Sequence, residues 1–263
     1  MSQKQETLTT EEWTKFLKDQ ADHTRAERHT LYDKVELKTK KNILDIGCGT
    51  GAIITDIASL TDGRITGIDI DKRKLEQAKK AASHIPCITF VEADALNLPF
   101  KDETFDLVVF SVALMYVKDK QKAVTEMVRV TQKNGIILAT MEPDHAGTLQ
   151  YPENELYPLF LKDLEELGAD LCTGRKLKYL FSKAGLQTEV GISTHDFDLM
   201  NTENDEQLKE FLNRFWVAEK LFRKNGWTKD QIKKYKQKRI ELIQNGMYFF
   251  FLPVFYAIGK KDR

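Results

Sequence analysis

Short apolar runs alternate with amphipathic segments between residues 42 and 141. The runs are hydrophobic on both faces, as expected of strands that helices cover on each side. Between the runs, apolar residues recur at helical spacing, for example at Ile53, Ile54 and Ile57. This alternation predicts a parallel sheet with crossover helices. The expected strands are Asn42–Ile46, Arg64–Ile68, Ile88–Val91, Leu107–Phe110 and Ile136–Met141.

The rest of the chain is mainly helical in pattern. Thr9 and Glu12 are spaced as a capping box, and so are Thr228 and Gln231. Two further strands are expected at Thr188–Thr194 and Met247–Gly259, and the second should bulge or break at Pro253, which cannot donate a ladder hydrogen bond. We expect one domain with a helical cap on one sheet edge. The core would comprise about 39–144, 175–198 and 246–260, and the cap segments 1–38, 145–174 and 199–245.

Composition narrows the classes of protein. The 263 residues include 40 Lys plus Arg and 40 Asp plus Glu, so no global charge attracts nucleic acid or an anionic membrane. No apolar run approaches the roughly 20 residues that span a bilayer, and the start is polar and acidic, unlike a signal peptide. Three well-separated cysteines indicate neither a disulfide framework nor a zinc site. We expect a cytoplasmic protein, monomer or homodimer, without metal.

The stretch NILDIGCGTGA, residues 42–52, forms a glycine loop after the first strand. Gly47, Gly49 and Ala52 fit the G-x-G-x-x-G/A pattern of dinucleotide sites. Asp45 argues against a pyrophosphate because its carboxylate would repel the phosphates. It suits a ligand that brings positive charge, such as the amino and sulfonium groups of S-adenosylmethionine; alternatively, Asp45 only caps a turn. The same pattern leaves an NAD-dependent oxidoreductase as the alternative.

Further polar residues follow the next strands at the same sheet edge. Asp69 lies 18 residues after Gly51, where a carboxylate can accept both ribose hydroxyls of either cofactor. Asp94 can accept from an adenine amino group, while the Ala95 N–H reaches a ring nitrogen; alternatively Asp94 only begins a turn. Ser111 leaves the fourth strand at the carboxyl edge, where ligands of such sheets bind.

These motifs together resemble the class I S-adenosylmethionine-dependent methyltransferases over about residues 42–144. LDIGCGTG, GIDID, EADALNLPF and FDLVVFSVALMYV are similar to four successive motifs, although the family's Pro-Gly-Gly turn is Lys133-Asn134-Gly135 here. The resemblance implies a Rossmann-like α/β fold with a seven-stranded, mainly parallel sheet whose last strand is antiparallel. It also implies S-adenosylmethionine as cofactor, with S-adenosylhomocysteine as product. The implied cofactor-binding residues are Asp45, Gly47, Cys48, Gly49, Gly51, Asp69, Ile70, Asp94, Ala95, Ser111 and Tyr116.

The N-terminal segment adds two candidates. Arg28 and Tyr32 can reach the methionine carboxylate of the cofactor if this segment closes over the pocket as a lid. The alternative is a permanently docked helix whose arginines face solvent. Arg25 and Arg175 are weaker candidates for an anionic group, and solvated helix arginines are the commoner case.

The methyl acceptor is less clearly indicated. The chain lacks the Asn/Asp-Pro-Pro-aromatic motif of amino-methylating DNA enzymes after the fourth strand, so the pattern resembles the small-molecule branch. Transfer from a sulfonium is an in-line displacement, and a general base is needed only for a protonated acceptor. Candidate catalytic residues are His145, Glu142 and Tyr116, with Asp144 also at the right edge. A non-catalytic adenosylmethionine-binding or accessory protein, and a methyltransferase acting on RNA or protein, remain alternatives.

Overall fold

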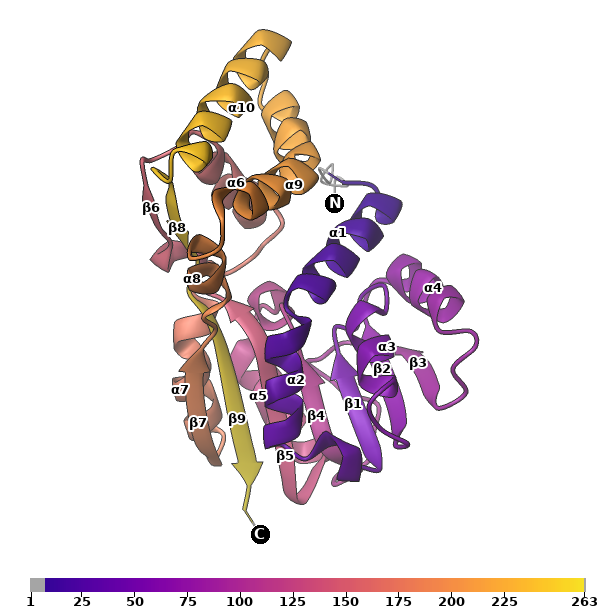
Figure 1. The fold of residues 1–263 in the computed structure, drawn as a ribbon. Coiled ribbons are helices and arrows are strands. Elements are labelled where there is room, and N and C mark those ends of the chain that lie inside the picture. The colour runs from indigo at the N-terminus through magenta and orange to yellow at the C-terminus, as the bar shows by residue number, and fades with distance from the viewer. Residues whose placement is uncertain (1–7, 263) are drawn as a thin grey trace.

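The computed structural model describes residues 8–262, apart from the side chains of residues 10, 13 and 195–197. Its main element is a seven-stranded sheet in the order β3-β2-β1-β4-β5-β9-β7 (Figure 1). β9 pairs antiparallel with both neighbours, while β3, β2, β1, β4 and β5 are mutually parallel. The strands are β1 Asn42–Ile46, β2 Arg64–Asp69, β3 Ile88–Glu92, β4 Phe105–Phe110, β5 Thr131–Pro143, β7 Leu186–Ile192 and β9 Val254–Lys261.

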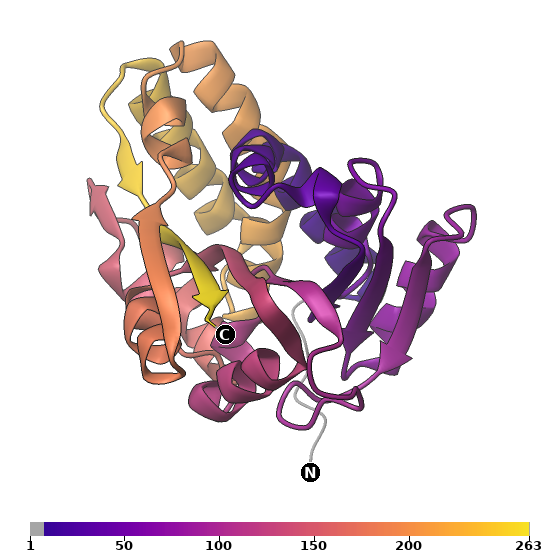
Figure 2. The ribbon, with the colours of Figure 1, turned by 90° about the horizontal axis from the view of Figure 1, so that it is seen from below.

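Helices cover both faces of the sheet, as Figure 2 shows from below. On one face, α2 and α3 enclose a core that includes Leu31, Ile54 and Leu138, and α4 packs on β2 and β3. On the other face, α5 and α7 enclose a second core with Phe110, Met127 and Phe181. The helices are α2 Arg25–Lys34, α3 Ala52–Ala58, α4 Lys72–Ala81, α5 Lys120–Val130 and α7 Thr173–Lys183.

A second lobe rises beyond the carboxyl ends of the parallel strands, at the top of Figure 1. Its small sheet pairs β6 with β8, and α6 packs on α9. Phe215, Phe222 and Tyr235 form its own apolar cluster. This second lobe consists of β6 Leu149–Tyr151, α6 Leu156–Glu166, α8 His195–Met200, α9 Asn204–Lys224, α10 Lys229–Gln244 and β8 Phe249–Phe251.

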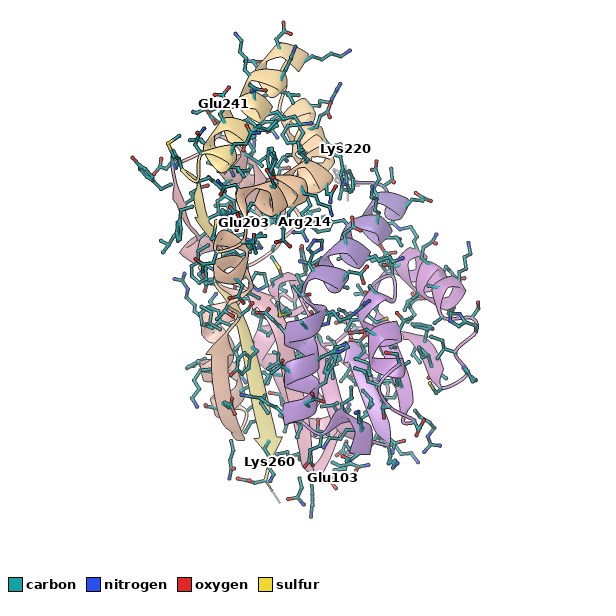
Figure 3. All side chains as sticks on the ribbon, in the orientation of Figure 1. Glu103, Glu203, Arg214, Lys220, Glu241 and Lys260 are labelled. Carbon is teal, nitrogen blue, oxygen red and sulfur yellow. The ribbon has the colours of Figure 1, made fainter. Side chains whose placement is uncertain are left out.

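Helix α1, Thr10–His23, bridges the second lobe and the glycine loop. Lys220 of α9 forms an ion pair with Glu12, and Figure 3 places Lys220 on the side of α9 that faces α1. His23 Nε2 lies 2.5 Å from Glu210 of α9. Toward the sheet, the Leu17 side chain lies 3.7 Å from where a Cβ on Gly49 would stand. Three short 3-10 helices complete the fold: η1 Leu37–Thr39, η2 Leu114–Tyr116 and η3 His145–Gly147.

Most sequence expectations agree with this fold. Both capping boxes form, and the expected final strand breaks at Pro253 into β8 and β9, so the proline lies outside the ladder. Two expectations were wrong. Segment 145–174 is not wholly helical, because β6 pairs with β8 there. The fifth strand does not begin at Ile136, because β5 starts at Thr131 and includes Asn134-Gly135 in a bulge, with Asn134 at φ +62°. No described helix is long and apolar enough to cross a membrane.

Candidate active site

The glycine loop turns sharply between β1 and α3. Gly47, Gly49 and Gly51 all have positive φ, of 70°, 53° and 94°, a region that favours glycine. A Cβ on Gly47 would lie 2.7 Å from the Ala113 Cβ, so the loop after β4 presses directly on this turn. The Gly49 N–H donates to Asp69 Oδ2 at 2.9 Å. The loop is therefore shaped by its glycines and by a carboxylate of the neighbouring strand.

Asp45 lies beneath this loop, near the carboxyl end of β1. Only 2% of its surface is exposed, and its Oδ2 has no hydrogen-bond partner among residues 8–262 as described. Burial, reinforced by the nearby charge of Asp69, raises the pKa of the Asp45 carboxyl to about 7. A buried carboxyl with an unsatisfied oxygen is costly unless a donor or cation joins it.

Two residues of α2 interact electrostatically with Asp45, and each carries a buried polar atom without a hydrogen-bond partner among the described residues. These atoms are the Tyr32 hydroxyl and the Arg28 Nε. Arg28 is fully buried, and its charge lowers the pKa of Asp45 against the effect of burial. Arg28, Tyr32 and Asp45 thus form a buried polar cluster with hydrogen-bonding capacity to spare beside the glycine loop.

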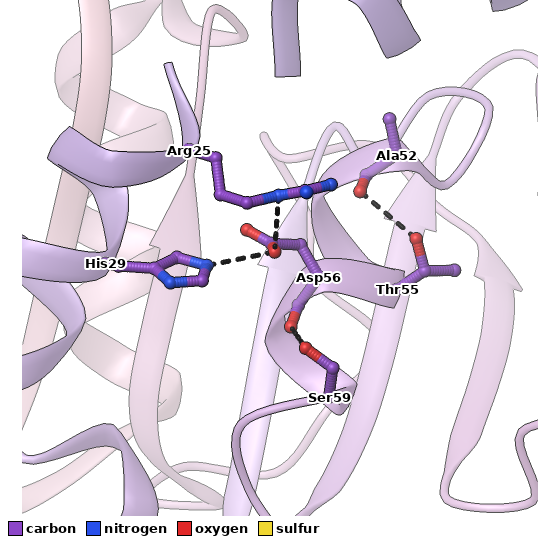
Figure 4. Close-up of a pocket in the computed structure, with 6 residues that line it drawn as sticks. All are labelled: Arg25, His29, Ala52, Thr55, Asp56 and Ser59. Atoms are coloured by element: carbon purple, nitrogen blue, oxygen red, sulfur yellow. Dashed lines mark hydrogen bonds and ion pairs between the residues drawn. The ribbon is translucent and has the colours of Figure 1, made fainter. Parts of the chain in front are cut away.

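Arg28 is held in place by Asp56 of α3, which the sequence analysis did not single out. Its guanidinium donates to Asp56 Oδ2 at 3.0 Å and to Thr24 Oγ1 at 2.5 Å. Arg25 and His29 also converge on Asp56 (Figure 4). The alternative of a solvent-facing Arg28 is therefore wrong. One sequence signal could have identified Asp56. It is the one charged residue of the helix Ala52–Ala58, which follows the glycine loop.

The predicted ribose and adenine residues lie in a row at the ends of β2 and β3. Besides Gly49, Asp69 accepts from the Asp71 N–H, at 2.8 Å. Ile70 is largely exposed despite its apolar side chain. Asp94 is exposed and accepts from the Leu96 N–H, so it does begin a turn. Cys48 is buried inside the loop, where burial raises the pKa of its thiol, and the half-buried Ala95 follows Asp94.

The loop after β4 is strained and anchored by Glu142. Val112 has φ +51°, which is rare for a β-branched residue. Residues with such strained backbones cluster at functional sites. Glu142 Oε1 accepts from the N–H groups of Ala113, at 2.9 Å, and Leu114, at 3.4 Å. Glu142 is fully buried, which raises its pKa to about 7, and no described residue provides a hydrogen-bond partner for its Oε2. Glu142 therefore positions the segment from half-buried Ser111 to half-exposed Tyr116, a role that the sequence did not reveal.

Beyond β5, Asp144 and His145 have different surroundings. Asp144 is buried and pairs with Arg175 through two contacts of 2.5 Å, so neither charge is free for a ligand. His145 is buried, with Nδ1 3.2 Å from the Tyr157 hydroxyl and its ring against Phe160. Burial lowers the pKa of His145 to about 4, so its imidazole is neutral at physiological pH.

This fold, with a glycine loop after β1 and acidic residues after β2 and β3, defines the class I S-adenosylmethionine-dependent methyltransferases. A family model described as a methyltransferase domain matches residues 44–139. The demethylmenaquinone methyltransferase of Staphylococcus haemolyticus is 33% identical over 177 residues, covering 60% of this chain and 73% of that protein. The chain belongs to this methyltransferase family, uses S-adenosylmethionine and is an enzyme of that class.

Two other similarities are informative. Norajmaline N-methyltransferase of Rauvolfia serpentina is 40% identical over 103 residues, which cover 38% of this chain and 35% of that protein. Phosphoethanolamine N-methyltransferase 2 of Haemonchus contortus, in complex with S-adenosyl-L-methionine, superposes with a TM-score of 0.57 at 19% identity. That match covers 86% of this chain and 50% of the other, and at this identity it supports the fold alone.

Proposed function

We propose that this enzyme methylates a small organic molecule held between the carboxyl edge of the sheet and the second lobe. The observation that carries the cofactor site is the unpartnered, buried oxygen of Asp45 beneath the glycine loop. The cofactor's ammonium group satisfies this oxygen, while the Arg28 and Tyr32 donors are suited to its carboxylate. This arrangement fits a zwitterionic methionine end and disfavours the pyrophosphate of NAD.

The remaining cofactor contacts follow the row of strand ends. We assign Asp69 and Ile70 to the ribose end, and Asp94 and Ala95 to the adenine. Asp69 keeps acceptor capacity for ribose hydroxyls because a carboxylate accepts about four hydrogen bonds and two are occupied. Ser111 and Tyr116 then lie nearest the sulfonium, on the loop that Glu142 positions.

The acceptor proposal is supported by the second lobe and by the relatives' names. The named acceptors of two relatives, demethylmenaquinone and norajmaline, are small organic molecules. In this chain, segments 145–174 and 199–245 contribute most of the second lobe, and segment 1–38 contributes α1, while its α2 packs on the sheet. We propose that the second lobe and α1 act as a cap on one core. Such a cap excludes water from the reaction, which an in-line displacement benefits from.

The cofactor supplies an electrophilic methyl group, and the protein's task is alignment and proton removal. A neutral imidazole at His145 can accept a proton from a protonated acceptor, although its low pKa makes it a weak base. Glu142 has a free oxygen and a pKa near 7, which suits a base better, but its other oxygen is engaged with the loop backbone. Tyr116 would line the site as an aromatic wall.

A tritiated-methyl transfer assay tests this function. The purified protein is incubated with labelled S-adenosylmethionine and separate fractions of small metabolites, RNA and protein. We expect label in the metabolite fraction alone. Label in RNA or protein would contradict the acceptor class, and binding of S-adenosylhomocysteine without any transfer would favour a non-catalytic module.

A lid movement of the N-terminal segment gives a separate prediction. Helix α1 touches the glycine loop through Leu17, and its contacts with α9 include the partly exposed pairs His23–Glu210 and Glu12–Lys220. We expect S-adenosylhomocysteine to slow amide hydrogen exchange across residues 10–35, because the cofactor would tie α2 to the glycine loop through Arg28. Exchange across α7 should not change and serves as the control. Equal protection of residues 10–35 with and without ligand would rule out the lid.

A further inference from the structure

Arg239 of α10 is a buried cation for which the described residues provide no anionic partner. It is 7% exposed, and neither its Nε nor its Nη1 has a hydrogen-bond partner within the part of the chain that the structure describes. Its Cζ lies 3.3 Å from the ring centroid of Tyr248 and 5.9 Å from that of Phe211. No carboxylate among the described residues forms an ion pair with it. Burying a guanidinium this way is unfavourable unless something else completes its contacts.

Aromatic rings lead from Arg239 toward the proposed reaction site. Tyr248 stacks on Phe250 at 6.5 Å, and Phe250 meets the Tyr157 ring edge to face at 5.7 Å. The Tyr157 hydroxyl in turn contacts His145 on the loop after β5. An unpaired cation therefore stands at one end of an aromatic row whose other end is the carboxyl edge of the sheet.

We propose that Arg239 binds an anionic oxygen group, a carboxylate or a phosphate, at the far end of the methyl acceptor. The apolar body of the acceptor lies along Tyr248, Phe250 and Tyr157, and its nucleophilic atom reaches the sheet edge. This inference rests on the proposed function and narrows its substrate class. The Tyr248 face fixes the guanidinium plane by a cation–π contact. The unpartnered donors then supply charge-assisted hydrogen bonds, which are stronger than neutral ones.

Calorimetry on the full-length chain with three matched probes tests the proposal. The probes are 1-naphthoate, 1-naphthyl phosphate and neutral 1-naphthamide, each titrated with and without saturating S-adenosylhomocysteine. We expect at least one anion to bind roughly tenfold or more tighter than the amide. Which anion binds tighter distinguishes a carboxylate from a phosphate. R239Q should abolish the preference, and K236Q should keep it, because Lys236 is a cation of the same helix that sits over Phe215.

A second variant separates ligand binding from folding. R239M fills similar space without the unpartnered donors, so the Tm of the ligand-free protein should not fall. A marked fall in Tm would assign Arg239 to structure and overturn the proposal. Equal affinity for anion and amide, no anion binding, or a preference that survives R239Q would also overturn it. Failure of the proposed function is distinguishable, because it appears as absent S-adenosylhomocysteine binding or absent methyl transfer in the wild type.

Discussion

Asp45→Asn is expected to stabilise the ligand-free protein while weakening its cofactor binding. The folded-state pKa of Asp45 is raised from 3.8 to about 7, so ionising this buried carboxyl opposes folding. At 1.36 kcal/mol per pKa unit, the free energy of unfolding of the variant at pH 8 should exceed that of the wild type by up to about 4 kcal/mol. Loss of the charged hydrogen bond should weaken S-adenosylmethionine by about 1–3 kcal/mol.

The pH dependence of this effect has a defined sign. Between pH 4 and 7 the unfolded state has released the Asp45 proton and the folded state keeps it, so wild-type stability falls as pH rises. The stability gap between variant and wild type should therefore be absent near pH 4, widen up to about pH 7 and stay constant above. Cofactor affinity of the wild type should rise from pH 6 to 8, because the carboxylate must ionise to pair with the ammonium, and this rise should vanish in the variant.

Denaturant unfolding across pH and calorimetry with S-adenosylhomocysteine provide the measurements. Glu126→Gln is a matched control for which we expect the opposite change in stability. Arg129 and the Leu98 N–H hold the pKa of Glu126 below its usual value, so its ionised form stabilises the fold. That variant should lose stability and leave the cofactor affinity unchanged. If Asp45→Asn destabilised the ligand-free protein at pH 8, or bound S-adenosylhomocysteine as tightly as the wild type, the role of Asp45 would be refuted.

Gly47→Ala is expected to damage both folding and cofactor binding. A left-handed backbone costs an alanine roughly 1–2 kcal/mol, and overpacking a tight contact costs roughly 1–3 kcal/mol more. Both terms apply because Gly47 has φ +70° and its added Cβ would meet Ala113 at 2.7 Å. We expect a loss of about 2–5 kcal/mol in the free energy of unfolding and at least tenfold in S-adenosylhomocysteine affinity, measured by urea unfolding and calorimetry.

Gly185→Ala isolates the backbone contribution. Gly185 has φ +85°, and a Cβ there would have nothing within 4 Å, so only the backbone cost of about 1–2 kcal/mol applies. The double variant Gly47→Ala with Ala113→Gly should recover the overpacking part, because it removes the clashing methyl group. Equal losses for Gly47→Ala and Gly185→Ala, with no recovery in the double variant, would show that the loop after β4 does not press on the glycine turn.

The sequence by itself determined the sheet, its glycine loop and the polar residues at its carboxyl edge. Each of these depends on local information: the apolar runs, the helical spacing after each run, and residues such as Gly47 and Asp69 placed directly at strand ends. Pro253 likewise fixed the break between β8 and β9, because a missing N–H is a property of the residue itself. Such features follow from backbone geometry and side-chain periodicity, and residues that are close in the sequence determine both.

Only the tertiary structure decided which polar side chains meet. Arg28 pairs with Asp56, and Asp144 pairs with Arg175, across separations of 28 and 31 residues. Glu142 anchors the loop after β4, and Arg239 is buried without an ion-pair partner among the described residues, although its sequence surroundings on α10 are lysine-rich. These outcomes depend on how helices pack on the sheet and on each other. Burial then sets the pKa of each group, and no local pattern encodes burial at a single charged position.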